Sequence, residues 1–287
     1  MNKDTLLYML TETSPFMMSF VLVTKEDNVI IIDGGRPEDI PLLKEYVGGR
    51  HISAWIFTHP HSDHISGFVD EWKKDKCADF DIERIVYNFP TPDWRETEKV
   101  FDREYFQRDF DEILPSFFEI EPELKSLVLK PEKGSVLEID EVKIDFLFTW
   151  HKELVSNPMN DSSLVFKVTA PNKTVMFLGD LGPDGGDVLL NESKGLLKAD
   201  IVQMAHHGHM DCDMDVYAEI APETCLWCAP DWLYAEGEYP HYLADREKLF
   251  KTGRHRMYGT AVTRKRMELL GVKSHLVTKD GTQKIIL

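Results

Sequence analysis

Cysteine is scarce in this chain of 287 residues, which contains only Cys77, Cys212, Cys225 and Cys228. Their spacing does not suggest a disulfide framework, so we expect free thiols in a reducing, cytoplasmic compartment. Cys225 and Cys228 form a C-x-x-C pair, but no second pair follows at the spacing of a zinc ribbon. We interpret both as small buried apolar residues on a strand.

Long apolar runs are also missing. No stretch approaches the roughly 20 apolar residues that a membrane-spanning helix needs. The first residues, Met1-Asn2-Lys3-Asp4, lack the basic character of a secretion signal. We therefore expect no membrane attachment. No repeat or low-complexity linker interrupts the chain, so one domain over residues 1–287 is predicted.

Positive charge is in short supply, because 33 Lys and Arg residues face 50 Asp and Glu residues and leave a formal net charge of −17. Binding to nucleic acid relies on Lys and Arg side chains that neutralise phosphates. The charge balance therefore disfavours nucleic acid as a partner and favours a small-molecule or ester-like substrate. Composition does not specify an oligomeric state.

Histidine, by contrast, is concentrated in one short run, Thr58-His59-Pro60-His61-Ser62-Asp63-His64. Neutral imidazoles and a carboxylate suit zinc and related divalent metals as ligands. The preceding apolar residues predict a strand that presents His59 and His61 on one face, because side chains alternate in an extended segment. Ser62 is predicted to cap a helix whose first turn carries Asp63 and His64. These four side chains could supply the first ligands of two adjacent metal sites.

Three further segments accompany this run. Asp33-Gly34-Gly35 follows an apolar hairpin, Asp180 ends one predicted strand, and His206-His207-Gly208 follows the next. In this order the segments resemble the metallo-β-lactamase superfamily, whose H-x-H-x-D-H signature is matched at every position by residues 59–64.

Within that superfamily the chain looks closest to the ComEC-like hydrolase domain and its free-standing relatives. The likeness depends on Asn160 to Phe166, Gly179-Asp180, the His-His-Gly triplet and Thr278 to Gly281. The chain departs from the pattern in two places. His209 stands where the ComEC pattern usually has Ser, and the Gly-His-Thr element that supplies a third histidine in lactamases and lactonases is missing.

Apolar periodicity predicts strands and helices that alternate along the chain. Strands are predicted at 16–24, 28–33, 53–57, 84–87, 126–130, 135–139, 142–149, 163–169, 174–178, 200–204, 225–229, 274–278 and 283–287. Helices are predicted at 38–47, 64–74, 95–113, 187–196, 214–220, 242–251 and 263–270. This pattern matches an α/β (α+β) protein, a four-layer αββα sandwich of the metallo-β-lactamase type. Asp280-Gly281 is predicted to form a hairpin turn between the last two strands.

Residues from about 88 to 123 are predicted to form a helical insertion. Aromatic and aliphatic side chains recur there at helical spacing from Phe101 to Phe118, interleaved with acids. We expect an amphipathic helix packed on the sandwich. The alternative is a lid that covers the active site, and the two roles are compatible.

The resemblance implies two divalent metal ions. His59 and His61 would bind the first ion, Asp63 and His64 would bind the second, and Asp180 would bridge both. About 3.5–4 Å apart, such ions would hold a bridging hydroxide and clamp the oxygens of a phosphoryl or carbonyl group.

One imidazole of the next motif would complete the second site. His206 is preferred, because in this superfamily the ligand follows directly on its strand. His207 would then be a proton donor or a substrate contact. His241 is expected either near the mouth of the site or as a helix cap. The expected catalytic groups are therefore Asp63, His207 and His241.

The third ligand of the first site is left open among Asn160, Asp161 and His151. Zinc is expected at both sites, but an oxygen ligand from Asn160 or Asp161 would favour manganese or iron at the first. Asp33, beside two glycines, is expected to anchor the backbone of the metal loop by hydrogen bonds.

Three function hypotheses follow. The leading one is a dinuclear metal-dependent hydrolase of a small or medium phosphoester, similar to a phosphodiesterase. A competence-type nuclease is the second, favoured by the resemblance and opposed by the acidic charge. The third is a binding or regulatory protein with a degenerate metal site, which the intact histidine run argues against.

Overall fold

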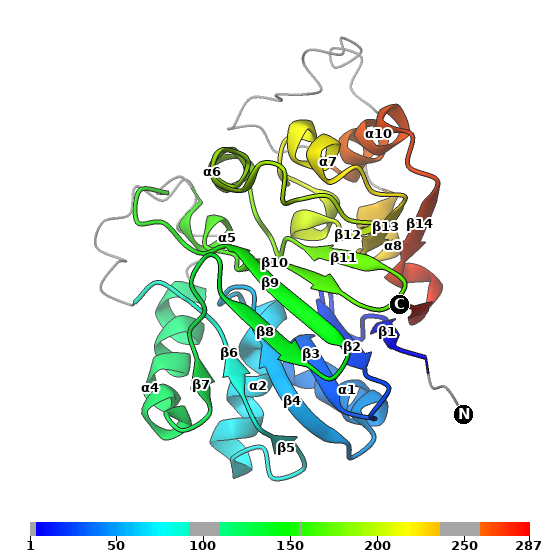
Figure 1. The fold of residues 1–287 in the computed structure, drawn as a ribbon. Coiled ribbons are helices and arrows are strands. Elements are labelled where there is room, and N and C mark those ends of the chain that lie inside the picture. The colour runs from blue at the N-terminus through cyan, green and yellow to red at the C-terminus, as the bar shows by residue number, and fades with distance from the viewer. Residues whose placement is uncertain (1–3, 92–108, 155–156, 236–258) are drawn as a thin grey trace.

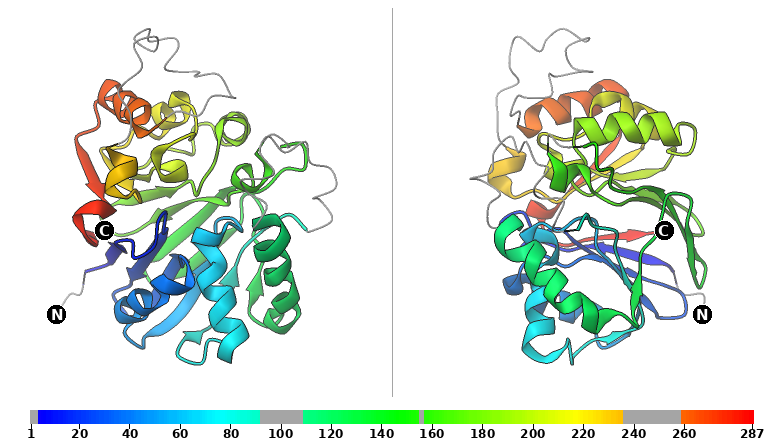
Figure 2. Two further views of the ribbon diagram at one scale, coloured as in Figure 1. Left: turned by 180° about the vertical axis from the view of Figure 1, so that it is seen from behind. Right: turned by 90° about the vertical axis from the view of Figure 1, so that its left-hand side faces the viewer.

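Two β-sheets pack face to face in a computed structural model of the chain, and helices cover the outer face of each sheet (Figures 1 and 2). The structure describes residues 4–91, 109–154, 157–235 and 259–287. The predicted four-layer αββα sandwich is confirmed. Among the described residues, no helix has the length and apolar character needed to cross a membrane.

The first sheet has the strand order β15-β1-β2-β3-β4-β6-β7, and β5 pairs with β4. Its strands are β1 (Leu6–Met9), β2 (Ser19–Val23), β3 (Val29–Asp33), β4 (His51–Ile56), β5 (Asp81–Ile82), β6 (Ile85–Val86), β7 (Val128–Leu129) and β15 (Gln283–Ile286). The helical segments on its outer face are η1 (Pro37–Asp39), α1 (Ile40–Val47), α2 (Ser62–Asp75), η3 (Asp109–Ile113) and α4 (Leu114–Leu124).

The second sheet has the strand order β14-β13-β12-β11-β10-β9-β8. Its strands are β8 (Val136–Ile139), β9 (Val142–Phe148), β10 (Val165–Thr169), β11 (Thr174–Phe177), β12 (Ile201–Gln203), β13 (Thr224–Trp227) and β14 (Ser274–Val277). The helical segments of this half are α5 (Pro158–Asp161), α6 (Pro183–Ser193), η4 (Ala205–Gly208), α7 (Met214–Ile220), α8 (Asp231–Tyr234), α10 (Thr260–Leu270) and η6 (Thr278–Asp280).

The central core lies between the two sheets and explains why the strands are so apolar. β2 and β3 are buried at every position, since one face meets the other sheet and the opposite face meets helices. The Phe177 ring from the second sheet packs on Phe20 from the first, with 5.1 Å between ring centroids. Burial on both faces favours unbroken apolar runs over alternation.

The strand directions bring the polar motifs to one edge of the sandwich. β3 and β4 are parallel, and so are β11, β12 and β13, so the carboxyl ends of each set lie together. The Leu164 amide donates a hydrogen bond to the Thr58 carbonyl at 2.8 Å and so links the second sheet to the histidine run.

Two local predictions are wrong. Ser62 is the first residue of α2, and His61 holds the cap position without a side-chain capping bond. The Ser62 amide is satisfied instead by the carboxylate of Asp109 at 2.7 Å, a partner distant in sequence. Asp280-Gly281 does not close a hairpin, because β14 pairs with β13 and β15 pairs with β1 in the other sheet.

The described part of the predicted helical insertion packs on the first sheet. Helix α4 begins at Leu114, one residue beyond the predicted end of a helix at 95–113, and its Phe117 ring packs on Tyr87 with 4.7 Å between centroids. Residues 92–108 lie outside the described part, so the lid stays a prediction. The predicted helix at 242–251 also lies outside it.

A buried ion-pair network holds the segment that follows the His-His-Gly turn. Arg266 on α10 is fully buried and contacts Asp211 Oδ1 at 3.2 Å and Asp213 Oδ1 at 3.3 Å. The other oxygen of Asp211 accepts a hydrogen bond from the Tyr217 hydroxyl at 2.7 Å, and that hydroxyl accepts one from the Ala205 amide at 3.2 Å. This chain of contacts ties α10 to the start of η4.

Arg266→Ala should therefore lower the free energy of unfolding by about 3–5 kcal/mol, because it leaves two buried carboxylates without their cation. Urea unfolding followed by circular dichroism measures the change. The matched control is Lys273→Ala, since the Lys273–Glu223 pair is exposed and should contribute nothing measurable. Equal stability of the two variants would contradict the structural role of the network.

Candidate metal centre

Asp33 at the end of β3 holds the start of the metal loop. Its buried carboxylate accepts hydrogen bonds from the Thr58 amide and the Thr58 hydroxyl, both at 2.8 Å. It also accepts one from His64 Nδ1 at 2.8 Å. The prediction that Asp33 anchors the loop is confirmed, because these bonds join β3, the end of β4 and the first turn of α2.

Two groups of ligating side chains lie at this edge, among the residues that the structure describes. The first contains His59, His61 and Asp180, and the second contains Asp63, His64 and His207. Within each group the ligating atoms lie within 4.8 Å of one another. Both groups are composed of imidazoles and carboxylates, which suit divalent metal ions.

Asp180 lies between the two groups. Its carboxylate is 3.6 Å from His59 Nε2 in the first group, and 3.4 Å from both His64 Nε2 and His207 Nε2 in the second. The Asp180 amide donates a hydrogen bond to the Ser163 hydroxyl at 3.0 Å, which fixes the backbone of this turn. The position suits a carboxylate that bridges two ions.

Two of the imidazoles are oriented by hydrogen bonds from Nδ1, the ring nitrogen that points away from the ligand groups. His64 donates from Nδ1 to Asp33, and His207 donates from Nδ1 to the Cys228 carbonyl at 2.8 Å. Their Nε2 atoms therefore face the cluster, where each is buried without a hydrogen-bond partner among the described residues. A ligating histidine typically makes such an outer bond, so the residues present fit a divalent metal ion.

The two neighbouring histidines of η4 point to different groups. His206 and His207 both have left-handed backbone angles, with φ of 47° and 57°. His207 Nε2 lies 3.3 Å from Asp63, whereas His206 Nε2 lies 3.4 Å from Asn160 Nδ2 and 4.0 Å from Asp180. We expected His206 in the second group, but the structure brings His207 there and turns His206 toward the first.

The two imidazoles also differ in their electrostatic surroundings. Burial lowers the pKa of His206 to about 4. Burial acts in the same direction on His207, but the neighbouring carboxylates of Asp180 and Asp63 outweigh it and raise the pKa of His207 to about 10. The carboxylates of Asp63 and Asp180 thus favour positive charge on or beside the His207 ring.

Gly208 allows the chain to turn away after His207. Its φ is +87°, and a Cβ atom there would lie 2.3 Å from the Trp227 ring. A larger residue would be strained in its backbone and would clash with a buried side chain. Gly208 therefore helps to set the direction in which the two histidines face.

The three candidates for the missing ligand have different surroundings. Asn160 is fully buried beside His206. Asp161 instead accepts hydrogen bonds from the amides of Gly182 at 3.1 Å and Gly185 at 3.0 Å, and so caps the start of α6. His151 lies 3.7 Å from Glu192 and belongs to neither described group. His241 lies outside the described residues.

Gln203 is a positioning residue that the sequence analysis missed. Its buried side-chain oxygen accepts hydrogen bonds from the amides of Leu178 and Gly179, both at 2.8 Å, and its amide donates to the Gly179 carbonyl at 2.9 Å. The end of β12 is thereby joined to the turn that carries Asp180. A polar residue that ends the apolar strand Ile201-Val202-Gln203 was the available signal, since buried amides need partners.

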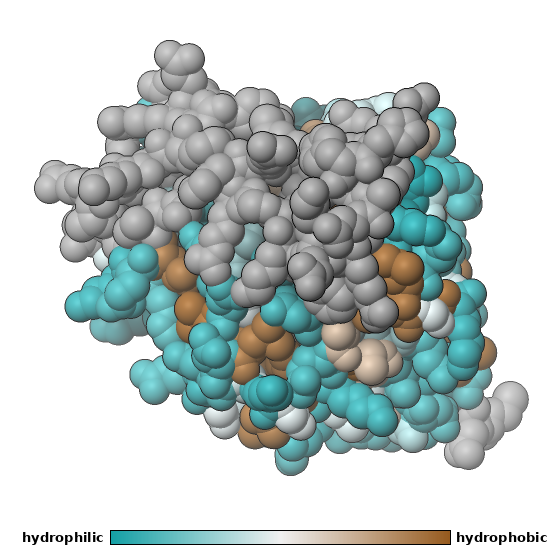
Figure 3. Space-filling model, turned by 90° about the horizontal axis from the view of Figure 1, so that it is seen from above, coloured by the Kyte–Doolittle hydropathy of each residue, from teal (hydrophilic) through white to brown (hydrophobic). Residues whose placement is uncertain are grey.

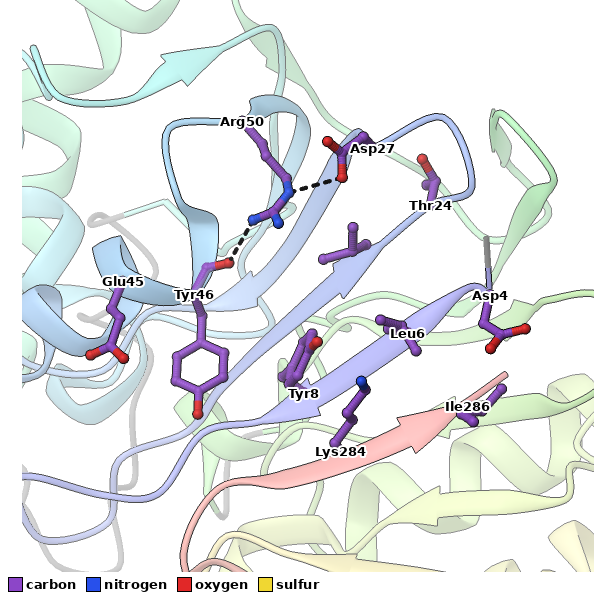
Figure 4. Close-up of a pocket in the computed structure, with 11 residues that line it drawn as sticks. Asp4, Leu6, Tyr8, Thr24, Asp27, Glu45, Tyr46, Arg50, Lys284 and Ile286 are labelled. Atoms are coloured by element: carbon purple, nitrogen blue, oxygen red, sulfur yellow. Dashed lines mark hydrogen bonds and ion pairs between the residues drawn. The ribbon is translucent and has the colours of Figure 1, made fainter. Parts of the chain in front are cut away.

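A separate hollow of about 580 Å³ lies at the opposite end of the first sheet (Figure 4). The residues that line it come from the β2–β3 turn, the end of α1 and the strands β1 and β15. Arg50 is held there by Asp27 at 3.0 Å and by the Tyr46 carbonyl at 3.3 Å. No histidine lines this hollow, so it lacks the imidazoles that are found in the two candidate ligand groups.

A family model described as the metallo-beta-lactamase superfamily matches residues 14–211. The chain belongs to the metallo-β-lactamase superfamily. The matched segment includes every member of the two ligand groups. As a member of this superfamily the chain is a metal-dependent hydrolase. The ComEC-like subtype remains a resemblance.

Two solved structures resemble the whole chain. YhfI from Bacillus subtilis, a protein of the metallo-β-lactamase fold, is 13% identical, with a TM-score of 0.55 over 98% of this chain and 100% of that chain. CmlA, a diiron β-hydroxylase from Streptomyces venezuelae, is 10% identical, with a TM-score of 0.52 over 100% of this chain and 55% of that chain. At this identity the likeness shows the fold alone. None of the curated proteins compared with the sequence matches it.

Asp180→Ala should reduce bound metal from about two ions per chain to fewer than one, because the bridging carboxylate contributes to both sites. Elemental analysis of protein reloaded with zinc and then desalted measures the loss. Asp79→Ala is a suitable control, since Asp79 is an exposed carboxylate paired with Lys44. Undiminished metal in Asp180→Ala would contradict the bridging role.

His207→Ala should lose about one ion per chain, because the second group would keep only Asp63, His64 and the shared carboxylate. His206→Ala should retain the ion of the second group. Cobalt-loaded protein distinguishes the two variants, since loss of one ligand changes the visible spectrum of only one site. Loss of the second ion in His206→Ala, with both ions retained in His207→Ala, would reverse the assignment.

Proposed function

We propose that the chain is a dinuclear metal-dependent hydrolase whose substrate is a small or medium phosphoester. The observation that supports this most directly is the pair of candidate ligand groups with the Asp180 carboxylate close to histidines of both. Two ions held there would activate a water molecule and clamp the oxygens of a phosphoryl group.

The proposed ligands of the first ion are His59, His61 and Asp180, with His206 as the third imidazole. A set of three nitrogen ligands favours zinc. Asn160 is the alternative, because its buried side-chain oxygen has no hydrogen-bond partner among the described residues. An oxygen ligand at that position would favour manganese or iron.

The proposed ligands of the second ion are Asp63, His64, His207 and the shared Asp180. The side chain of Asp63 is 13% exposed, whereas those of His64 and His207 are almost fully buried. Asp63 therefore faces the side from which a substrate can approach. In this position its carboxylate can orient a water molecule or accept a proton.

The distribution of charge favours a small substrate. A net charge of −17 opposes the approach of a polyanion, which needs a basic surface. In the view from above, the coloured surface is mainly hydrophilic with smaller apolar patches (Figure 3). A small phosphodiester carries little charge, so the same repulsion affects it far less than DNA.

Zinc-loaded protein should therefore hydrolyse a chromogenic phosphodiester faster than it degrades single- or double-stranded DNA at equal phosphate concentration and physiological salt. A panel with a monoester, a lactone and a thioester compares the rate of phosphodiester hydrolysis with the rates for other ester-like bonds. His59→Ala, prepared and loaded in the same way, is the inactive control.

The outcome distinguishes the alternatives. Processive DNA degradation that exceeds phosphodiester turnover would favour the competence-type nuclease. Two tightly bound ions without turnover of any substrate in the panel would favour a binding or regulatory protein. Either result would contradict the proposed function.

A further inference from the structure

Aromatic side chains stand directly beside the second ligand group. Phe16, His209 and Trp232 form a contiguous set, here called the aromatic wall. Phe16 meets the edge of His207 with 5.3 Å between ring centroids and stacks on His209 at 5.7 Å. Trp232 meets Phe16 at 5.2 Å with an interplanar angle of 88°. The wall thus reaches from a proposed metal ligand to the protein surface.

The end of β13 supports both the ligand and the wall. The carbonyl of Cys228, directly after this strand, accepts the hydrogen bond that orients His207. Trp232 follows four residues later on α8, next to β13 in Figure 1. The Thr260 hydroxyl donates a hydrogen bond to the Leu233 carbonyl at 2.6 Å and holds this short helix. Trp232 is therefore presented from a fixed backbone.

Phe16 is held in an uncommon conformation. It lies between β1 and β2 with a φ of +63°, in the left-handed region that bulky residues rarely adopt. Such a conformation persists only where the surroundings impose it, and it is concentrated at functional sites. The ring is only partly buried, so core packing alone does not account for its position.

Trp232 remains 54% exposed although it is large and apolar. A single exposed apolar side chain is ordinary on a protein surface. Trp232 differs because its ring contacts Phe16, which in turn contacts His207. A planar group that packs against Trp232 would therefore lie close to the candidate metal centre. Stacked and edge-on contacts between aromatic rings are favourable beyond the area that they bury.

We propose that the aromatic wall binds a planar aromatic group of the substrate, adjacent to the phosphoester bond that is cleaved. This inference rests on the proposed function, since the phosphoryl group would be held at the metal cluster. Trp232 and Phe16 are then specificity-determining residues, which select aryl phosphoesters over small alkyl phosphoesters.

The test measures binding of two phosphonates to the zinc-loaded protein by calorimetry. Phenylphosphonate and methylphosphonate present the same anionic group, and only the first carries an aromatic ring. We expect phenylphosphonate to bind about tenfold more tightly than methylphosphonate. Trp232→Ala should abolish this preference while its metal content and its affinity for methylphosphonate stay unchanged, and Trp232→Phe should retain most of it.

Two further variants keep the test decisive. Phe16→Gly removes the other ring and relieves the backbone conformation, so it should fold and also lose the preference. Tyr8→Ala removes an aromatic ring at the far hollow of Figure 4 and should keep it. Equal affinities for the two phosphonates in the unaltered protein, or a preference that survives both wall variants, would overturn the proposal. Failure of both phosphonates to bind fully loaded protein would instead contradict the phosphoester function on which it rests.

Discussion

A buried carboxylate surrounded by imidazoles is the constraint around which this edge of the molecule is organised. Asp180 is 1% exposed, and nitrogen atoms of His59, His64 and His207 lie between 3.4 and 3.6 Å from its oxygens. Removing a charged carboxylate from water is costly unless opposite charge or hydrogen bonds replace the solvent. Divalent cations in the two ligand groups would supply that charge. The outer hydrogen bonds of His64 and His207 orient both rings for this purpose before any ion binds.

The parts of the site that the sequence predicted are those that depend on local structure. The apolar runs of β3, β4 and β11 each end where a motif begins, so strand prediction alone places Asp33, His59 and Asp180 at strand ends. Parallel strands then bring such ends to a common edge. The resemblance to a known superfamily added the αββα order of the layers, which periodicity alone does not determine.

The predictions that failed depend on contacts between residues distant in sequence or on unusual backbone angles. Alternation along an extended strand cannot determine which of His206 and His207 faces which group, because both have positive φ. The Ser62 amide is satisfied by Asp109, a residue distant in sequence that no local pattern indicates as a partner. Gln203 was overlooked for the same reason, since its partners belong to the neighbouring strand end.

The end of β13 connects metal binding with the proposed selection of substrate. Its Cys228 carbonyl fixes the ring of His207, and the same backbone continues into the helix that carries Trp232. Phe16 lies between β1 and β2 of the first sheet, and its ring contacts both His207 and Trp232. A displacement of this strand end would therefore move a proposed metal ligand and the aromatic wall together. Such coupling keeps the distance between a bound planar group and the metal cluster constant, as positioning a reacting bond requires.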